Sequence, residues 1–367
     1  MAAAEVSEAG GAAIAGERGV VTIWLRHLLA FWFPANACLF LATGPHPWYV
    51  AWLFVLPLAL AHHWDTSGRI ERRQPRDDVP AWPFDAIVYA LVALQLVNVA
   101  LLARLFSVQG FWSLDFLLAV LVVGASSGYQ IITAHELIHR TPRWEQMLGR
   151  LLLCTVLYEH FYTEHIRGHH VRVGTPDDPA TARFGESFHR FYFRTVPAQF
   201  ASAWRLEKKR LGDESMPLLD RRMLRHRVLH GLVVEWGLAF AILAFAGAVA
   251  FAAFVLQALF ASRLLEIVNY FEHWGLVREG KRVAPIDSWD THSWFTYYAL
   301  IGLSRHADHH AWAARPYQKL RVWDEAPILP SGYVGMIPLV VLANRRFQKL
   351  ATEELRRRRL GPFRDAA

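Results

Sequence analysis

The chain has 367 residues, of which 54% are hydrophobic, and a formal net charge of +7. This composition is typical of a polytopic membrane protein, and the charge does not indicate nucleic-acid binding, because Lys and Arg lie in loops between apolar stretches. The two cysteines, Cys38 and Cys154, lie in apolar stretches and form no Cys-x-x-Cys motif, which excludes a disulfide framework and a fused thiolate-iron domain.

The chain begins with a predicted tail and continues into six predicted membrane spans. Residues 1–19 are expected to be disordered, because the first 16 are rich in Ala, Gly and Glu and lack the features of a signal peptide. A membrane-crossing helix needs about 20 predominantly apolar residues. Such stretches lie near residues 22–42, 47–63, 84–105, 112–134, 230–248 and 251–271. Residues 20–350 are therefore predicted to form one all-α membrane domain, and residues 351–367 a basic tail.

The connecting segments predict the orientation of this bundle. Residues 43–48 and 106–110 contain no Lys or Arg, whereas the segment near Arg72 and the long segment 140–227 are basic. Lys and Arg concentrate on the cytoplasmic side of membrane proteins. We therefore expect both termini on that side, together with a helical cap built from the long segment.

Nine of the 18 histidines fall into three short clusters and one isolated position. They are His135 and His139; His165, His169 and His170; His306, His309 and His310; and His273. A spacing of four residues on a helix places His135 and His139 on one face. His165 and His169 share a face in the same way, whereas His170 turns about 100° away. All nine are predicted at the cytoplasmic end of the bundle, so we expect a single site.

The size of this set predicts two metal ions. A tetrahedral ion takes four ligands and an octahedral ion takes six, so nine imidazoles exceed what one ion binds. Imidazole donors with open positions suit iron, copper or zinc, and redox chemistry favours iron or copper. A metal transporter or storage protein is a further alternative, but its ligands would be spread along the membrane normal.

An alternative interpretation rests on one cluster alone. The residues His135-Glu-Leu-Ile-His139 fit the H-E-x-x-H signature of zinc proteases, in which the glutamate acts as general base. That site needs one further ligand and leaves most of the other histidines without a role. The two-metal interpretation is therefore preferred.

Four motifs resemble those of membrane-bound non-haem di-iron alkane monooxygenases, within the fatty-acid desaturase and hydroxylase superfamily. They are His135-Glu-Leu-Ile-His-Arg140, Glu164-His-Ile-Arg-Gly-His-His170, Asn269-Tyr-Phe-Glu-His-Trp-Gly-Leu276 and Leu303-Ser-Arg-His-Ala-Asp-His-His310. The Asn-Tyr-x-Glu-His motif is typical of the alkane-hydroxylase branch. Flanking stretches at 175–181, 185–187 and 329–333 look similar as well.

The resemblance implies a six-helix bundle in the bacterial inner membrane that holds two iron ions through these nine histidines. It implies insertion of one oxygen atom from O2 into an unactivated C–H bond, usually a terminal methyl, of an alkane taken from the lipid. Electrons would come from rubredoxin, acting in trans, and its NAD(P)H-dependent reductase. A desaturase or hydroxylase of fatty-acyl chains, or an alkyl-aromatic (xylene-type) monooxygenase, would use the same ligands.

The chain departs from the family pattern beside one ligand, which bears on the substrate. Trp274 stands where the family usually has Tyr, and we expect it to alter the substrate pocket. The small residues Gly124, Ser127 and Gly128 precede His135 in the fourth span. They predict either a channel toward the metals or close helix packing.

Acidic residues beside the histidines are candidates for supporting the ligands. Ligating imidazoles usually donate their other N–H group to a carboxylate or a carbonyl. The candidates are Glu136, Glu164, Glu272 and Asp308, each adjacent to a histidine or within two residues of one, and Asp65 at the end of the second span.

Overall fold

The computed structural model describes residues 17–364, which form helices, turns and loops with no β-strand among them. The predicted all-α class is confirmed. Most of the predicted N-terminal tail lies outside the described residues, and α1 already begins at Glu17.

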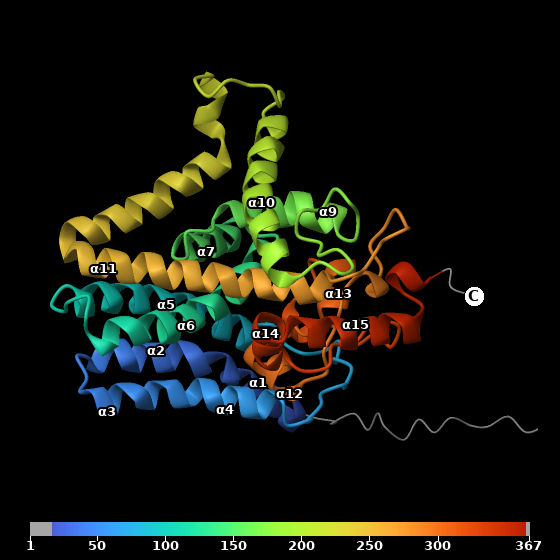
Figure 1. Ribbon diagram of the computed structural model, residues 1–367, viewed down its shortest axis with the longest axis horizontal. Coiled ribbons are helices and arrows are strands. Elements are labelled where there is room, and N and C mark those ends of the chain that lie inside the picture. The colour runs from blue at the N-terminus through green and yellow to red at the C-terminus, as the bar shows by residue number, and fades with distance from the viewer. Residues whose placement is uncertain (1–16, 365–367) are drawn as a thin grey trace, which may run out of the picture.

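A bundle of roughly parallel segments forms the larger part of the molecule (Figure 1). Its elements are α1 (Glu17–His27), η1 (Leu28–Phe31), α2 (Trp32–Thr43), α3 (Trp48–Ala51), η2 (Trp52–Val55), α4 (Leu56–Asp65), α5 (Trp82–Phe106), α6 (Leu114–Ile138) and α11 (Arg227–His273). Four described segments are long and apolar enough to cross a membrane: Gly19–Thr43, Trp82–Phe106, Leu114–Ile138 and Arg227–His273. The chain is therefore a membrane protein.

The start of α6 and the bend in α11 follow from local sequence. The Ser113 side chain accepts a hydrogen bond from the Phe116 N–H at 3.1 Å and so caps the first turn of α6. Within α11, Gly247 has φ 86° and ψ 178°, a conformation that is essentially restricted to glycine. The helix reverses direction there, and its two halves form the sharp V in Figure 1.

Small residues bring α6 and α11 into close contact. A Cβ atom on Gly124 would lie 2.8 Å from the Phe260 ring, and one on Gly128 would lie 2.8 Å from Leu264 Cδ1. Helix association in lipid depends on such packing, because apolar side chains gain little by leaving the lipid. Gly124 therefore serves packing, as one of the two sequence interpretations expected.

Buried polar side chains also join the bundle helices. The Gln95 amide donates to Ser127 Oγ at 3.2 Å and to Thr155 Oγ1 at 3.1 Å. Gln257 donates to the Thr155 carbonyl at 3.0 Å. These bonds connect α5, α6 and α11 through Thr155, the residue after α7. They fix the position along the bundle of the end of α6, which carries His135.

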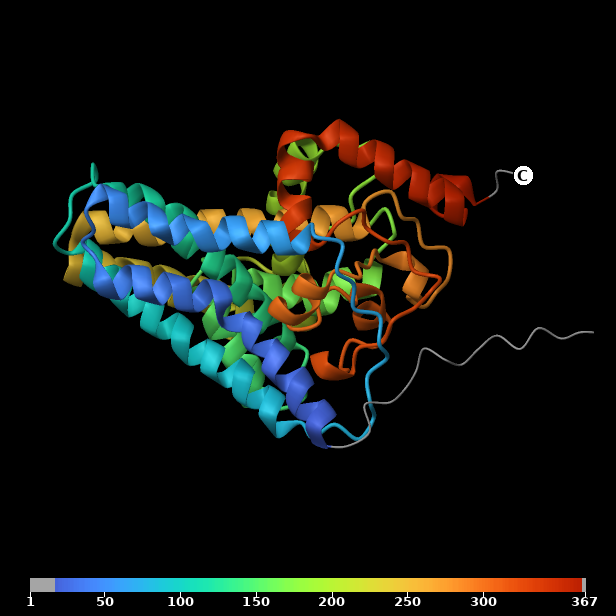
Figure 2. The ribbon, with the colours of Figure 1, turned by 90° about the horizontal axis from the view of Figure 1, so that it is seen from below.

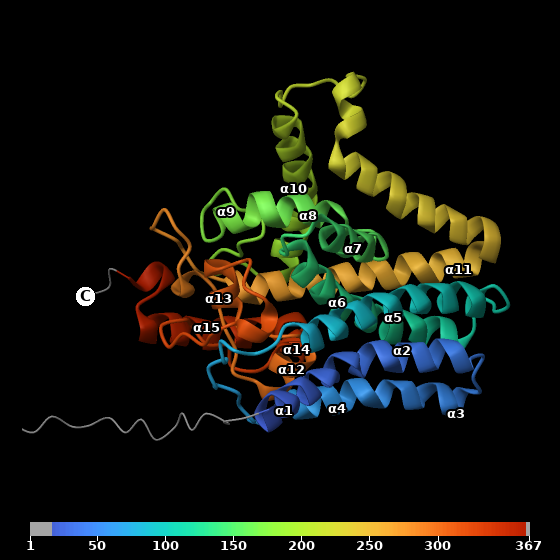
Figure 3. The same cartoon turned by 180° about the vertical axis from the view of Figure 1, so that it is seen from behind.

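The remaining elements, from α7 to α10 with η4 and from η5 to η7, are together called the cap below. They are α7 (Arg143–Cys154), α8 (His160–Glu164), η3 (His165–His169), α9 (His170–Arg172), α10 (Phe188–Arg210), η4 (Arg221–Arg225), η5 (Pro285–Asp287), α12 (Trp294–Ala299), α13 (His306–Ala311), η6 (Tyr317–Lys319), α14 (Tyr333–Leu342), α15 (Asn344–Arg358) and η7 (Gly361–Phe363). Figures 1 and 3 place α7–α9 beside the second half of α11, and α12–α15 at one end of the bundle.

The C-terminal part is packed where the sequence predicted a basic tail. Helix α15 continues into that region, and Ala351 and Leu355 are fully buried within it. Two arginines, Arg357 and Arg358, pair with Glu354 on the same helix. The run of arginines suggested a solvated tail, but the apolar residues between the charges give the helix one buried face.

Candidate metal centre

All nine predicted histidines meet at the end of α6, inside the cap. They come from α6 and its C-cap, from α8–α9, from the end of α11 and from α13. Their potential ligand atoms form three groups, and within each group all the atoms lie within 4.8 Å of one another. The groups are His135, His139, His165, His170 and His309; His169, His273 and His310; and Glu272, His273 and His306.

The first group contains imidazoles alone. The Nε2 atom of His170 lies 3.0 Å from that of His165 and 3.2 Å from that of His309. The rings of His135 and His309 lie 4.4 Å apart, centroid to centroid. Five imidazoles from α6, η3, α9 and α13 thus point at one small volume.

The second and third groups share His273 and together form the second half of the cluster, in which the third group includes the carboxylate of Glu272. The Nε2 atoms of His273 and His306 lie 3.3 Å apart, and Glu272 Oε2 lies 3.2 Å from His306 Nε2. His169 and His310 complete this half of the cluster, with ring centroids 4.9 Å apart. His273, isolated in the sequence, is therefore central in space.

A π-helical turn over His165–His169 changes one sequence expectation. The His165 and His169 rings stack with centroids 5.4 Å apart, as their spacing predicted, but the wider turn brings residues five apart together and so places His165 in one group of potential ligands with His170. His169 turns to the other group. Gly168 permits this turn, since a Cβ atom there would lie 2.6 Å from a carboxylate oxygen of Glu164.

The imidazoles fit metal ions. The Nε2 atoms of His135, His139 and His169 are buried without a hydrogen-bond partner, and so are both ring nitrogens of His310. Buried polar atoms normally have partners, so these lone pairs point to an absent ligand. Burial lowers the pKa of His165, His170 and His309 well below the usual value, and the neutral imidazole is the form that binds metal.

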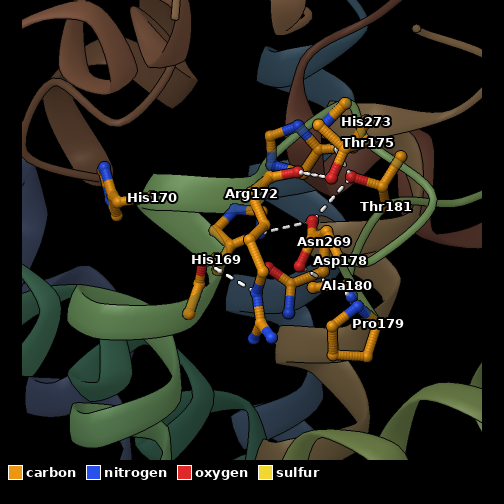
Figure 4. Close-up of polar contacts among 12 residues, drawn as sticks. His169, His170, Arg172, Thr175, Asp178, Pro179, Ala180, Thr181, Asn269 and His273 are labelled. Carbon is orange, nitrogen blue, oxygen red and sulfur yellow. Dashed lines mark hydrogen bonds and ion pairs between the residues drawn. The ribbon is translucent and has the colours of Figure 1, made fainter. Parts of the chain in front are cut away.

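Asp178 supports the cluster, although sequence reasoning missed it. Its Oδ2 atom lies 2.9 Å from His169 Nδ1 and accepts the Thr181 hydroxyl at 2.6 Å (Figure 4). The contact places the proton on Nδ1 and leaves Nε2 free to bind a metal. The signal was available, because Asp178 stands in the 175–181 stretch that carries the family resemblance and follows His170 by eight residues.

Asp290 is a second carboxylate that sequence reasoning did not select. Its Oδ1 atom accepts the backbone N–H of Ala307 at 2.7 Å, at the first turn of α13. A carboxylate there satisfies a donor that the helix leaves unpaired and so fixes where α13 begins. This positions His306, the neighbour of Ala307.

Of the five acidic candidates from the sequence, Glu272 alone contacts a histidine of the cluster. Its other oxygen accepts the Tyr333 hydroxyl at 2.6 Å. Glu136 instead pairs with Arg140 at 3.2 Å, and Glu164 pairs with Arg172 at 2.6 Å. Sequence adjacency was misleading here, because neighbouring residues on a helix point about 100° apart.

Asp308 and Asp65 hold the cap together at other places. Asp308 accepts hydrogen bonds from Arg315 at 2.5 and 2.6 Å and from the Trp323 indole at 2.7 Å. Asp65 accepts hydroxyl hydrogen bonds from Ser293 at 2.5 Å and Thr296 at 2.6 Å, which tie α4 to α12.

The contact of Glu136 with Arg140 also removes the zinc-protease alternative. In that mechanism the glutamate must face the metal-bound water between the two histidines. Here the carboxylate pairs with the Arg140 guanidinium, in a cluster with Asp85 and Glu145, and it is not among the potential metal-binding groups.

An apolar cavity of about 60 Å³ opens onto the cluster. His135, His165 and His306 form one end, and side chains such as Ile132, Leu264 and Ile337 form its walls. Of the predicted pocket residues, Gly128 lines this cavity.

Trp274, Gly124 and Ser127 are not among the residues that line the cavity. The Trp274 indole is fully buried just after the end of α11, donates to the Glu186 carbonyl at 3.1 Å and packs against Phe347. Trp274, in place of the usual Tyr beside His273, therefore changes the packing against α15 and not the cavity wall.

The fold and the site together define an all-helical membrane protein with three adjoining groups of side chains that could hold metal ions. The fatty acid desaturase family model matches residues 111–339. Alkane 1-monooxygenase 2 of Alcanivorax borkumensis is 32% identical over 338 residues, which cover 86% of this chain and 86% of that protein.

Other relatives match over a shorter range. Alkane 1-monooxygenase 1 of Pseudomonas aeruginosa is 42% identical over 58% of this chain, and the match spans 56% of that relative's length. The xylene/toluene monooxygenase hydroxylase component of Pseudomonas putida is 23% identical over 56% of each protein. The chain therefore belongs to the fatty acid desaturase family, in its alkane 1-monooxygenase branch.

Proposed function

We propose that this protein is an O2-dependent di-iron monooxygenase that hydroxylates an unactivated C–H bond, at a terminal methyl group, of an alkane or a similar hydrophobic molecule. The observation that carries the proposal is the apolar cavity ending on histidines of both halves of the cluster. The alkane 1-monooxygenase relatives, among them one aligned over 86% of its length, support the same reaction.

The nine histidines would hold the two irons, five in the imidazole-only group and four in the other. When bound, the irons supply the activation of O2 that side chains cannot supply alone. Asp178 orients His169 by accepting its Nδ1 proton. Glu272 accepts a hydrogen bond from the Tyr333 hydroxyl and lies beside His306. It therefore adds negative charge to the same half of the cluster as Asp178.

The cavity side chains select and orient the substrate. Much of the wall consists of Ile, Leu and Val side chains, which offer no hydrogen-bond donor, although Tyr129 and Asn269 also line the cavity. An unbranched alkyl chain fits such a wall, and its end would rest beside His135 and His165. This arrangement favours hydroxylation near the end of the alkyl chain.

Six membrane spans with cytoplasmic termini complete the proposal. The two halves of α11 count as separate spans because Gly247 folds the helix back, and residues 48–65 add the sixth. Exposed apolar residues such as Val233 and Phe245, 66% and 92% exposed, would face lipid. The metal centre would then lie on the cytoplasmic side, where rubredoxin, reduced by its NAD(P)H-dependent reductase, delivers electrons in trans.

Product analysis tests this function. Membranes containing the protein, with rubredoxin, its reductase and NAD(P)H, are incubated with octane, a fatty acid and a xylene. We expect 1-octanol as the main product. A new double bond in the acyl chain with octane unchanged would favour a desaturase, and oxidation of xylene alone would favour an alkyl-aromatic monooxygenase.

A further inference from the structure

A second, polar cavity of about 850 Å³ lies where two of the membrane segments begin. Ile23 and Arg26 line it from α1, and Phe84 lines it from the first turn of α5. Its other walls come from residues 69–76, from α12, and from Arg305 and Gln318. None of the nine histidines lines it, so it is separate from the candidate metal centre.

The wall formed by residues 69–76 is fixed to the start of α12 by backbone hydrogen bonds. The Trp294 N–H donates to the Arg69 carbonyl at 2.9 Å, and the Glu71 N–H donates to the His292 carbonyl at 2.8 Å. In Figure 2 the trace between α4 and α5 passes along the same end of the molecule as α12. The cavity wall is thus an ordered part of the cap.

The cavity is rich in arginine and holds one carboxylate. Arg26, Arg69, Arg72, Arg73, Arg76 and Arg305 line it, together with Glu71. Glu71 forms ion pairs with Arg73 and, at 3.8 Å, with Arg26, while Arg72 pairs with Asp324 and Arg76 pairs with Asp78, both outside the cavity wall. Arg69 stacks on Trp294, 4.5 Å from the ring centroid, and forms no ion pair with any residue of 17–364. The lining therefore keeps an excess of positive charge.

Two buried side chains in the lining have polar atoms without a hydrogen-bond partner. Arg305 is 3% exposed, and its Nε–H group has no acceptor, although its other nitrogens donate to the carbonyls of Leu320 and Arg73 and its guanidinium stacks on Tyr297, 4.1 Å from the ring centroid. Within the described chain no carboxylate pairs with it. Both amide atoms of Gln318, which is 4% exposed, are also without partners. Buried cations and buried donors are normally paired, so these groups are suited to binding an anion.

We propose that this cavity binds a phosphate group at the membrane surface. Arg305 Nε and the Gln318 amide would donate to phosphate oxygens from below, while Arg26 and Arg69 would do so from the rim. Guanidinium groups suit phosphate because their planar N–H donors match its oxygens. The proposal concerns a ligand site apart from the hydroxylation chemistry and rests only on the membrane placement given above.

The position of the cavity favours a lipid headgroup as the source of the phosphate. Basic pockets at the cytoplasmic ends of membrane helices commonly bind anionic headgroups. Ile23 and Arg26 lie in the first eight residues of the membrane segment Gly19–Thr43, and Phe84 lies in the first turn of α5, so the cavity is near that depth. Ile23, Val79 and Phe84 give its lining an apolar part for the glycerol and acyl carbons. A protein carboxylate would use the arginines and leave this apolar surface uncovered.

Native mass spectrometry of the delipidated, iron-loaded protein in detergent tests the proposal. Phosphatidylglycerol and inorganic phosphate are titrated separately into the wild type, Arg26→Gln, Arg69→Gln and the double variant. Arg346→Ala is the matched control, because Arg346 is an exposed arginine on α15 outside the cavity. We expect phosphatidylglycerol affinity to fall roughly 10- to 30-fold in the double variant and to stay unchanged in the control.

The two ligands distinguish the source of the phosphate. Lipid binding that depends on the arginines supports a headgroup site, and arginine-dependent binding of inorganic phosphate with no lipid preference assigns the site to the free anion. Equal binding of both ligands by the wild type and the double variant overturns the proposal. So does arginine-dependent binding of an acidic protein with no phosphate effect. Iron content and hydroxylation are measured alongside and report separately on the proposed function.

Discussion

The two halves of the histidine cluster are built differently. In the first, five imidazoles from four segments surround one volume, and Phe161 stacks on His165 with centroids 4.6 Å apart. In the second, Asp178 contacts His169 and Glu272 contacts His306. Carboxylates that contact ligating imidazoles fix their tautomer and raise their basicity. We therefore expect a metal in the first half to depend on geometry alone, and a metal in the second half to depend on charge compensation as well.

Loss of a ligand in the imidazole-only half should have the largest effect. We expect His309→Ala to reduce hydroxylation by at least about 100-fold, because the imidazoles that remain in this half would bind the metal ion more weakly. Iron per chain, measured by plasma mass spectrometry, should fall while membrane insertion persists. His189→Ala is the control, since His189 is exposed on α10. Full activity in His309→Ala would remove His309 from the ligand set.

Loss of a supporting carboxylate should have a smaller effect, confined to the other half. Asp178→Asn keeps the size of the side chain but removes the negative charge that faces the Nδ1–H group of His169. Iron affinity should therefore fall about 10- to 100-fold. The neighbouring Asp177→Asn is the matched control, because Asp177 is exposed. Equal iron loss in both variants would contradict the positioning role of Asp178.

A substitution in the cavity should change selectivity and leave the iron content unchanged. In Gly128→Ala the added methyl meets Leu264, which itself lines the cavity, so the space for substrate shrinks. We expect roughly a tenfold shift in kcat/KM toward shorter alkanes. Gly124→Ala, which meets Phe260 outside the cavity wall, should lower thermal stability without that shift. An identical product profile in both variants would mean that Gly128 serves packing alone.

Substitution of Glu159, a buried carboxylate outside the histidine cluster, should have the smallest effect. Burial raises the pKa of Glu159 to about 7, and this outweighs its ion pair with Arg150. The folded state then holds a proton that the unfolded state has lost, so stability falls as the pH rises from about 4.5 to about 7 and is level above that range.

The apparent unfolding temperature in detergent, measured from pH 5 to pH 8, checks this pH dependence. The wild type should lose a few degrees more than Glu159→Gln across the range. A parallel decline in both proteins would show that another group titrates.

The sequence predicted the helical class and the residues of the site better than it predicted their arrangement. Helical periodicity gave the pair His135 and His139, since α6 is regular up to its last turn. The same rule did not predict the contact of His165 with His170, because a π turn cannot be inferred from regular spacing.

Long-range contacts explain most of the other differences. Asp178 reaches His169 through a loop, and Asp65 reaches Ser293 across more than 200 residues, so neither contact follows from local pattern. Trp274 was expected in the pocket because it follows His273. One step along a helix turns the side chain by about 100°, which here directs it toward α15.

Counting iron in matched variants decides whether the two halves each hold a metal ion. We predict two irons per chain in the active wild type and in Asp177→Asn. We predict close to one in Asp178→Asn after dialysis against a weak chelator, because the half with carboxylate support loses its metal first. A wild type with one iron, or with zinc alone in active protein, would contradict a cluster that holds two irons in two different halves.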